Sequence, residues 1–205
     1  MNWIEFKNKM FALGCFSIHQ VYAWRPSFDR NNLVRWVKKG YLVHLRRGWY
    51  AFPEYKDTPD FAEYIAGKIY TPSYISLHSA LALYGLIPES VVQITSVTSL
   101  KTASFTNEFA EYSYKSVKND LMFGYFRRPI VDGRATPYAT REKALLDLLY
   151  LYPFYTTASE LVELRLDQDI LRENWDRQTW LSMGKRFQCA RLEKRMRLLE
   201  KVYSL

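Results

Sequence analysis

The sequence predicts an α+β fold in two parts, a small helical unit with a hairpin followed by a larger mixed domain. Apolar residues recur with helical spacing over about the first 40 residues, and two β-rich runs then flank an Arg-Arg-Gly turn. A β pattern extends from Val91 to about Tyr138, before a helical carboxyl terminus. We therefore expect one domain over 1–56 and a mixed α/β domain with a mainly antiparallel sheet over 57–205.

Composition excludes several classes of protein. The chain has 205 residues, 48% of them hydrophobic, which is enough to bury a core, so disorder is not expected. No apolar run approaches the roughly 20 residues of a membrane span, and the first residues lack the pattern of a signal peptide. Cys15 and Cys189 lie far apart in sequence, which favours reduced, buried thiols over a disulfide. These features predict a cytoplasmic protein without a membrane partner.

The net charge of +8 is unevenly distributed. Residues 1–56 contain ten Lys or Arg and three Asp or Glu, whereas residues 57–184 contain twelve and sixteen. Residues 185–205 contain seven Lys or Arg and two Asp or Glu. A basic excess in a small unit is typical of polyanion binding, because each cation near a phosphate releases condensed counterions. Charge alone fits a solvated basic surface equally well, so the residue pattern has to decide.

Three short helices are predicted in the first 40 residues. The apolar face of the first helix has spacings of three, four and three and is closed by a glycine: Trp3, Phe6, Met10, Leu13 and Gly14. Ser17 is expected to cap the second helix. Ser27 follows an Arg-Pro break and is expected to cap the third helix, which runs to Lys39 and ends at Gly40.

The third helix separates apolar from polar residues. At 100° per residue, one side collects the apolar positions Leu33, Trp36 and Val37. Asn31, Arg35 and Lys38 lie on the opposite side. An amide pairs with adenine and a guanidinium with guanine in the major groove, although the same face also suits ordinary exposure to solvent.

A basic hairpin follows this helix directly. Residues 41–45 and 49–52 are β-rich, and the turn between them is Arg46-Arg47-Gly48. This combination is typical of a winged helix-turn-helix, whose helix enters the major groove while its hairpin holds phosphates or probes the minor groove. Asn31 and Arg35 are the candidates for base edges. The candidates for phosphates or groove walls are Ser27, Arg30, Lys38, Lys39, Arg46 and Arg47.

Helix caps and turns also organise the second part. Thr58, with Pro59 in the first helical position, is expected to start one helix, and Ser76 another that Gly85 closes. Strands are expected up to about Tyr138, with turns near 99–102, 118–120 and 132–133, before a helix capped by Thr140. The last helix has an apolar stripe that is expected to pack within the chain: Leu192, Met196, Leu199 and Tyr203.

Three segments resemble a known family. They are LVRWVKKGYLVHLRRGWYAFP, PSYISLHSALALYGLIPE and ATREKALLDLLYL, and the resemblance covers roughly residues 15–152. In these segments the chain resembles the AbiEi-like antitoxins of bacterial type IV toxin–antitoxin, or abortive-infection, systems. The resemblance implies a winged helix that binds double-stranded DNA at its own promoter, as a repressor. It also implies a second domain that counters a nucleotidyltransferase-type toxin without requiring a stable complex.

No catalytic constellation is evident, so neither an enzyme nor a metal or other cofactor is expected. His19, His44 and His78 are isolated, and no phosphate-binding glycine motif occurs. Asp167-Gln-Asp169 has the D-x-D form of a nucleotidyltransferase but lacks the required Gly-Ser turn, which favours a helix cap. Glu54-Tyr55-Lys56 has the E-x-K form of a metal-dependent nuclease but lacks a preceding strand that ends in Asp.

Some alternatives remain open at this stage. One is the metal-dependent nuclease, and another is an RNA-associated or toxin-sequestering module whose winged helix contacts protein. Adjacent predicted strands carry the aromatic residues Tyr112, Tyr114, Phe123 and Tyr125. These side chains suit either stacking on the bases of a nucleic acid or packing within a sheet, and packing is favoured. The basic segment 185–201 suits a second contact with DNA or a contact with RNA.

Overall fold

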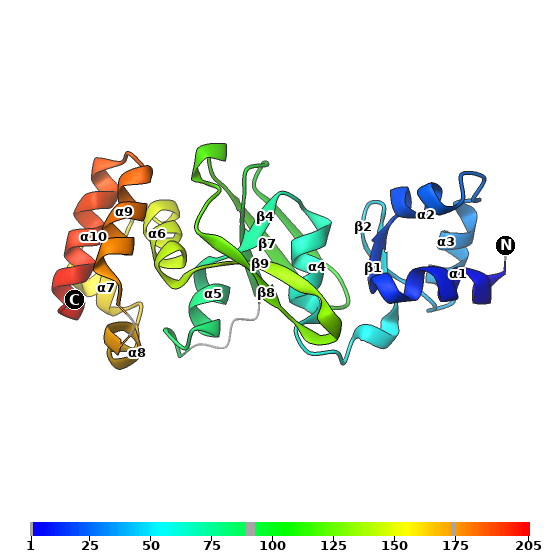
Figure 1. Ribbon diagram of the computed structural model, residues 1–205, viewed down its shortest axis with the longest axis horizontal. Coiled ribbons are helices and arrows are strands. Elements are labelled where there is room, and N and C mark those ends of the chain that lie inside the picture. Colours follow the sequence, from blue (N-terminus) through cyan, green and yellow to red (C-terminus); the bar gives the residue numbers. More distant parts are fainter. Residues whose placement is uncertain (1, 89–92, 174) are drawn as a thin grey trace.

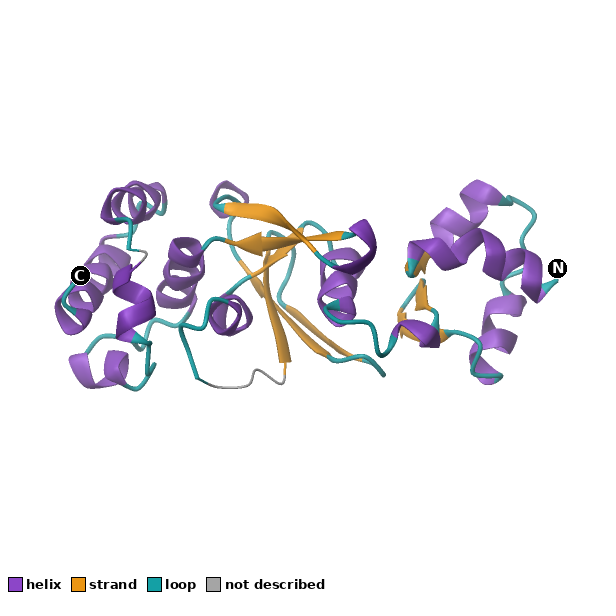
Figure 2. Ribbon diagram, turned by 60° about the horizontal axis from the view of Figure 1, so that its bottom comes forward, coloured by secondary structure: helices purple, strands orange, loops and turns teal. Residues whose placement is uncertain are grey.

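The computed structural model describes residues 2–88, 93–173 and 175–205. These residues form a mixed α/β structure that is long and narrow (Figure 1). The N-terminal unit, residues 2–56, lies at one end, a six-stranded sheet lies in the middle, and helices α7–α10 lie at the other end. Figure 2 shows the larger sheet between these two helical ends.

The N-terminal unit combines three helices with a small antiparallel sheet. Its strands pair in the order β1-β3-β2, so the edges are β1 and β2. The elements are α1 (Trp3–Met10), a 3₁₀ turn (Phe11–Leu13), β1 (Cys15–Ser17), α2 (Ile18–Trp24), α3 (Asn31–Lys38), β2 (Val43–Arg46), β3 (Trp49–Ala51) and a second 3₁₀ turn (Pro53–Tyr55). Its core is largely aromatic, because Phe6, Phe16 and Phe52 are fully buried within it.

The predicted helix boundaries at Ser17 and Gly40 are confirmed, and the one at Ser27 is wrong. Ser17 caps α2 through a capping box with Gln20, and Gly40 ends α3 with a φ of 72°. Ser27 does not cap α3, which begins only at Asn31. The Asp29 carboxylate accepts the Asn31 N–H at 2.9 Å and so satisfies the first free amide of the helix, a role that Asp fills better than a more distant serine.

The larger sheet is mixed and has the strand order β6-β7-β5-β4-β9-β8. Its strands are β4 (Ser73–Ile75), β5 (Gln93–Thr98), β6 (Ala103–Thr106), β7 (Glu111–Ser116), β8 (Tyr125–Pro129) and β9 (Ala135–Ala139). The β4–β5, β6–β7 and β8–β9 pairs are antiparallel, and β4–β9 and β5–β7 are parallel. Strand β4 has no alternating pattern because all its residues are buried, so the sequence pattern missed it. The strand expected from Val91 begins outside the described residues.

Helices cover both faces of this sheet. The helices after residue 57 are α4 (Phe61–Ile69), α5 (Leu77–Leu83), α6 (Arg141–Leu151), α7 (Ala158–Val162), α8 (Gln168–Glu173), α9 (Arg177–Arg186) and α10 (Ala190–Tyr203). Of these, α4, α5 and α6 contact the sheet. In Figure 1, α4 lies on the side of the N-terminal unit, and α5 and α6 lie on the other side. The apolar stripe of α10 is buried, and α10 contacts α6, α7 and α9, so the predicted packing within the chain is confirmed. Among the described residues, no helix has the length and apolar character that a membrane crossing requires.

The predicted cap at Thr58 is wrong, whereas Ser76 and Thr140 stand at the predicted N-cap positions. Helix α4 begins at Phe61 rather than after Thr58, with Asp60 as its N-cap residue in a left-handed conformation (φ 58°). Ser76 is the N-cap residue of α5, but its side chain accepts no capping hydrogen bond and instead donates its hydroxyl to Asp147 Oδ2 at 2.9 Å. Thr140 caps α6 as predicted.

The two cysteines are free thiols. Cys15 is buried in the N-terminal unit, whereas Cys189 is half-buried. Burial raises the pKa of the Cys15 thiol to about 12, despite the opposing effect of nearby Lys68 and Arg134. Cys15 is therefore a packing residue that stays protonated near neutral pH.

Candidate nucleic-acid interface

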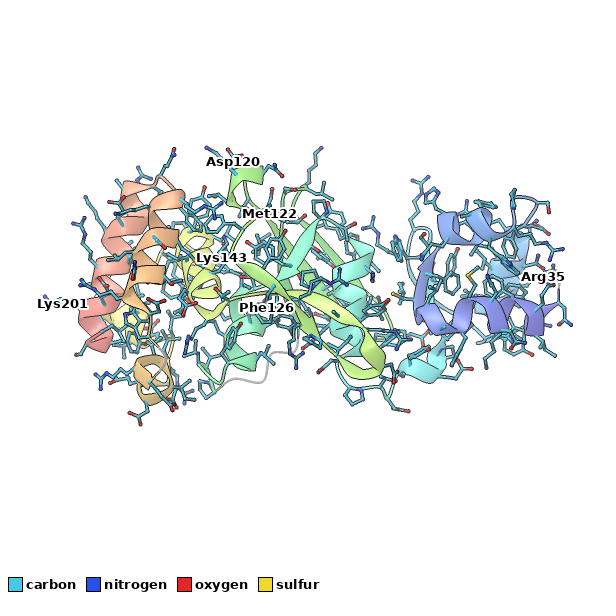
Figure 3. All side chains as sticks on the ribbon, viewed as in Figure 1. Arg35, Asp120, Met122, Phe126, Lys143 and Lys201 are labelled. Atoms are coloured by element: carbon cyan, nitrogen blue, oxygen red, sulfur yellow. The ribbon has the colours of Figure 1, made fainter. Side chains whose placement is uncertain are left out.

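Aromatic packing fixes the rotation of α3 about its axis. Leu33 is fully buried and Trp36 is nearly so, and the Trp36 ring lies 4.5 Å from Phe6 and 5.0 Å from Trp3 between centroids. With this apolar side held against α1, the opposite side of α3 has to face outward. Figure 3 places Arg35 at the end of the molecule farthest from the C-terminal helices.

The outward face carries the polar residues that the sequence predicts. Asn31, Arg35 and Lys38 are all exposed. So are Ser27 and Arg30 before the helix and Lys39 at its end. The ion pairs among the described residues do not include Arg30, Arg35, Lys38, Lys39 or Arg47. These cations are therefore available to an external anion.

A buried amide orients Arg35. The Asn32 side chain is only 5% exposed; its Nδ2 donates to the Asp29 carbonyl at 2.9 Å, and its Oδ1 accepts from Arg35 Nη2. The guanidinium is thus held by a neutral partner and keeps its full charge. Asn32 is not among the residues predicted from the sequence, although an Asn three residues before an Arg on a helix has the spacing for this contact.

Val34 adds an apolar element beside the polar face. Its side chain is 48% exposed, and it lies on the helix surface one turn from Arg30 and Lys38. An exposed aliphatic group in this position has the chemistry to contact a thymine methyl group in a major groove. The sequence does contain a signal for this contact, because Val34 falls between the apolar side and the polar side of α3 at 100° per residue.

The structure corrects the role of Arg46. Its Nη1 donates to the Ile69 carbonyl at 2.8 Å, and its guanidinium carbon lies 5.1 Å from the ring centroid of Tyr70 and 4.4 Å from that of Phe105. Arg46 therefore holds the hairpin against α4 and the central sheet, and the predicted phosphate contact is wrong. Arg47, the next residue, is exposed at the turn, where Gly48 has a φ of 78°.

Further contacts attach the same side of the N-terminal unit to the rest of the chain. Arg134 Nη2 donates to the Ala12 carbonyl and to the Tyr55 hydroxyl, each at 3.0 Å. The Phe61 ring stacks on Tyr55 with centroids 4.6 Å apart. In Figure 1, the strands of the unit face the central sheet, and α1 and α3 lie on the outer side. The outer face is thus the one that remains free.

Neither of the two acidic motifs forms a metal site. Glu54 pairs with Lys7, and Lys56 pairs with Glu108. The two residues of the E-x-K motif therefore do not share one site. The Asp167 carboxylate accepts hydrogen bonds from the backbone N–H groups of Asp169 and Ile170. Asp167 is therefore the helix cap that the sequence predicts. Within the described part of the chain, no three His, Cys, Asp or Glu side chains gather closely enough to hold a metal ion. His19 and His44 are exposed, and His78 is half-buried.

The predicted aromatic residues mostly pack inside the protein. Tyr112 and Tyr114 are fully buried, and Phe123 is 8% exposed. Tyr125 is the exception; it is 42% exposed and stacks on Tyr74 with ring centroids 4.7 Å apart. Packing within the sheet accounts for these residues better than base stacking does.

The two most distinctive sequence segments of the second part meet at one buried ion pair. Lys143 and Asp147 on α6 are fully buried, and Lys143 Nζ donates to Asp147 Oδ1. Tyr74 and Ser76 each donate a hydroxyl to Asp147 Oδ2 at 2.9 Å. Burial raises the pKa of Asp147 and lowers that of Lys143, and the contact between the two charges opposes both shifts. This cluster locks α6 to the start of α5.

Comparison with known proteins gives no assignment. The chain matches no protein-family model and no curated protein. The chemistry of its own surfaces therefore carries the functional proposal.

Proposed function

We propose that residues 1–56 are a winged helix-turn-helix domain that binds duplex DNA, and that the chain is a non-catalytic transcriptional regulator. The observation that carries the proposal is the exposed face of α3, where Asn31, Arg35 and Lys38 face outward. The order α1-β1-α2-α3-β2-β3, with a hairpin directly after α3, supports it. The second domain, residues 57–205, would then hold the regulatory function.

The dimensions of α3 suit a major groove. An α-helix with its side chains is about 10–12 Å in diameter, and the groove is about 12 Å wide. Asn31 and Arg35 are proposed to contact base edges, with Val34 beside them. The remaining contacts go to phosphates, which fix position without selecting sequence. These phosphate contacts are assigned to Ser27, Arg30, Lys38, Lys39 and Arg47. Arg46 is no longer proposed as a phosphate contact.

The direct experiment is binding to the DNA upstream of the protein's own gene. Fluorescence anisotropy with a labelled upstream duplex, a shuffled duplex of equal length and single-stranded RNA compares the candidate ligands. We expect the upstream duplex to bind more tightly than the shuffled one, with a footprint inside it. Equal binding to both duplexes would contradict sequence-specific regulation, and preference for RNA would favour the RNA-binding alternative.

A matched pair of hairpin variants separates the two arginines. Arg47→Ala should weaken binding to all duplexes and reduce the slope of log affinity against log salt by about 0.9, which corresponds to one lost phosphate contact. Arg46→Ala should leave the slope unchanged and instead lower the free energy of unfolding by about 1–3 kcal/mol, because it loses a hydrogen bond and two cation–π contacts. Binding isotherms at several salt concentrations and thermal melts measure both effects. A reversed result would exchange the two assignments.

Arg35 and the amide that orients it should act on specificity together. Arg35→Ala is expected to reduce discrimination at one base pair by about 1–3 kcal/mol. Asn32→Ala leaves the charge in place but releases the guanidinium, so part of the same discrimination should be lost while the salt slope stays constant. Affinities for all single-base variants of the site, combined in a double-mutant cycle, measure this coupling. Strictly additive effects of the two substitutions would contradict the positioning role of Asn32.

The resemblance to AbiEi-like antitoxins extends the proposal to a biological role. On that basis we propose that the protein represses its own promoter and counters a nucleotidyltransferase-type toxin. Coexpression with the product of an adjacent gene that carries a Gly-Ser and D-x-D signature tests this role. Growth rescue by the full chain supports it, and unrelieved toxicity argues against it.

A further inference from the structure

A concave site lies at the opposite end of the molecule from α3. A cavity of about 350 Å³ opens between α10 and the segment that follows α6, and its lining residues are Pro153, Thr156, Arg191, Lys194, Arg195 and Leu198. Half of these residues are cationic and none is acidic. In Figure 3, the label of Lys201 marks the end of the molecule where α10 lies, far from Arg35. This site is therefore separate from the proposed DNA interface.

Arg195 is the unusual member of the lining. It is only 6% exposed, and its Nε is buried without a hydrogen-bond acceptor. The Nε of Arg46 is also buried without an acceptor, but that guanidinium donates to the Ile69 carbonyl through Nη1. Among the described residues, no carboxylate forms an ion pair with Arg195.

A guanidinium whose buried Nε has no acceptor and which pairs with no carboxylate of the described residues is electrostatically unfavourable. Burial lowers the pKa of Arg195, and the positive charge of Arg191 one helical turn away lowers it further. The exposed ammonium of Lys194 adds a third positive charge to the same cavity. Glu160 accepts the Thr156 hydroxyl at 3.2 Å but is not part of the lining. A cavity with this lining favours an anionic ligand.

We propose that this cavity binds the phosphate group of a small phosphorylated molecule, with Arg195 as the central contact and Arg191 and Lys194 at its rim. Guanidinium groups bind phosphate oxygens through paired, charge-assisted hydrogen bonds. The volume lies in the range of small-molecule sites, and Leu198 and Pro153 offer an apolar wall to the rest of the ligand. A concave site of this size favours a free phosphorylated compound over the backbone of a long nucleic acid.

The test measures thermal unfolding of the full chain with inorganic pyrophosphate and with ADP, against sodium chloride of equal ionic strength. At a ligand concentration about 100-fold above Kd, the melting temperature should rise by about 5–10 °C. Arg195→Met should abolish this rise and, because it removes an unpaired buried charge, should raise the melting temperature of the protein without ligand. A purely structural role for Arg195 predicts the opposite change in the ligand-free protein.

Two further variants complete the design. Arg197→Met is the matched control, because Arg197 lies on the same helix with a side chain that is 77% exposed, outside this cavity, and the control should respond to ligand as the wild type does. The Arg191→Met/Lys194→Met double variant changes only exposed side chains and should weaken binding at least tenfold, which keeps the test valid if Arg195→Met does not fold. No stabilisation of the wild type by either ligand, or equal stabilisation of Arg195→Met, would overturn the proposal. So would binding of an oligonucleotide at this site in place of both small ligands.

Discussion

Lys143→Met is expected to lower the free energy of unfolding by about 3–5 kcal/mol, because it leaves the Asp147 carboxylate buried without its counter-charge. Tyr74 and Ser76 would still donate to Asp147, but two neutral hydroxyls do not replace a cation. Urea unfolding followed by circular dichroism measures the change. The exposed Lys201→Met variant is the control and should stay within about 0.5 kcal/mol of the wild type.

This destabilisation should depend on pH with a definite sign. Burial raises the pKa of Asp147, and loss of Lys143 removes the group that opposes the rise most strongly. A carboxyl group whose pKa is higher in the folded than in the unfolded protein stabilises the fold at a pH below its unfolded pKa, about 3.9. This stabilisation is lost as the pH rises through the folded pKa. The deficit of Lys143→Met should therefore shrink as the pH falls towards about 4 and be largest at neutral pH.

A double variant provides the decisive comparison. Lys143→Met/Asp147→Asn removes both charges but keeps an acceptor for the hydroxyls of Tyr74 and Ser76, so it should recover much of the stability lost in Lys143→Met. A double variant that is less stable than Lys143→Met at pH 7 would show that the carboxylate is not the source of the cost.

Gly14→Ala is expected to destabilise the protein by about 2–5 kcal/mol, which combines backbone strain with overpacking. Gly14 has a φ of 70°, and an added Cβ would lie 2.7 Å from Cε2 of Phe61 on α4. Phe61 is itself held by its stacking on Tyr55, so the ring has little room to move. The substitution therefore acts where the N-terminal unit meets the rest of the chain.

Gly40→Ala is the matched control for this prediction. Gly40 has nearly the same φ, 72°, but an added Cβ there would have no neighbour within 4 Å. It should cost only the backbone strain, about 1–2 kcal/mol. Thermal melts of the two variants separate the strain from the contact with Phe61. Equal losses in both variants would show that the Phe61 ring yields to the added methyl group without cost.

Local sequence alone determined several helix ends and the face of α3 that points outward. Ser17, Thr140 and Gly40 act through hydrogen bonds and backbone angles within a few residues, and the spacing of Leu33 and Trp36 sets the buried side of α3. Such features depend on near neighbours in the chain, so the amino-acid pattern is sufficient to predict them.

Only the tertiary structure decided which polar groups meet across the chain. Arg46 has the same charge as Arg47, yet one packs on Phe105 and the other is exposed. Ser76 has the position of a helix cap but bonds to Asp147, 71 residues later. The buried state of Arg195 likewise has no counterpart in the local pattern. The free energy of a charge or hydroxyl depends on burial and on partners supplied by distant segments, which only the folded arrangement specifies.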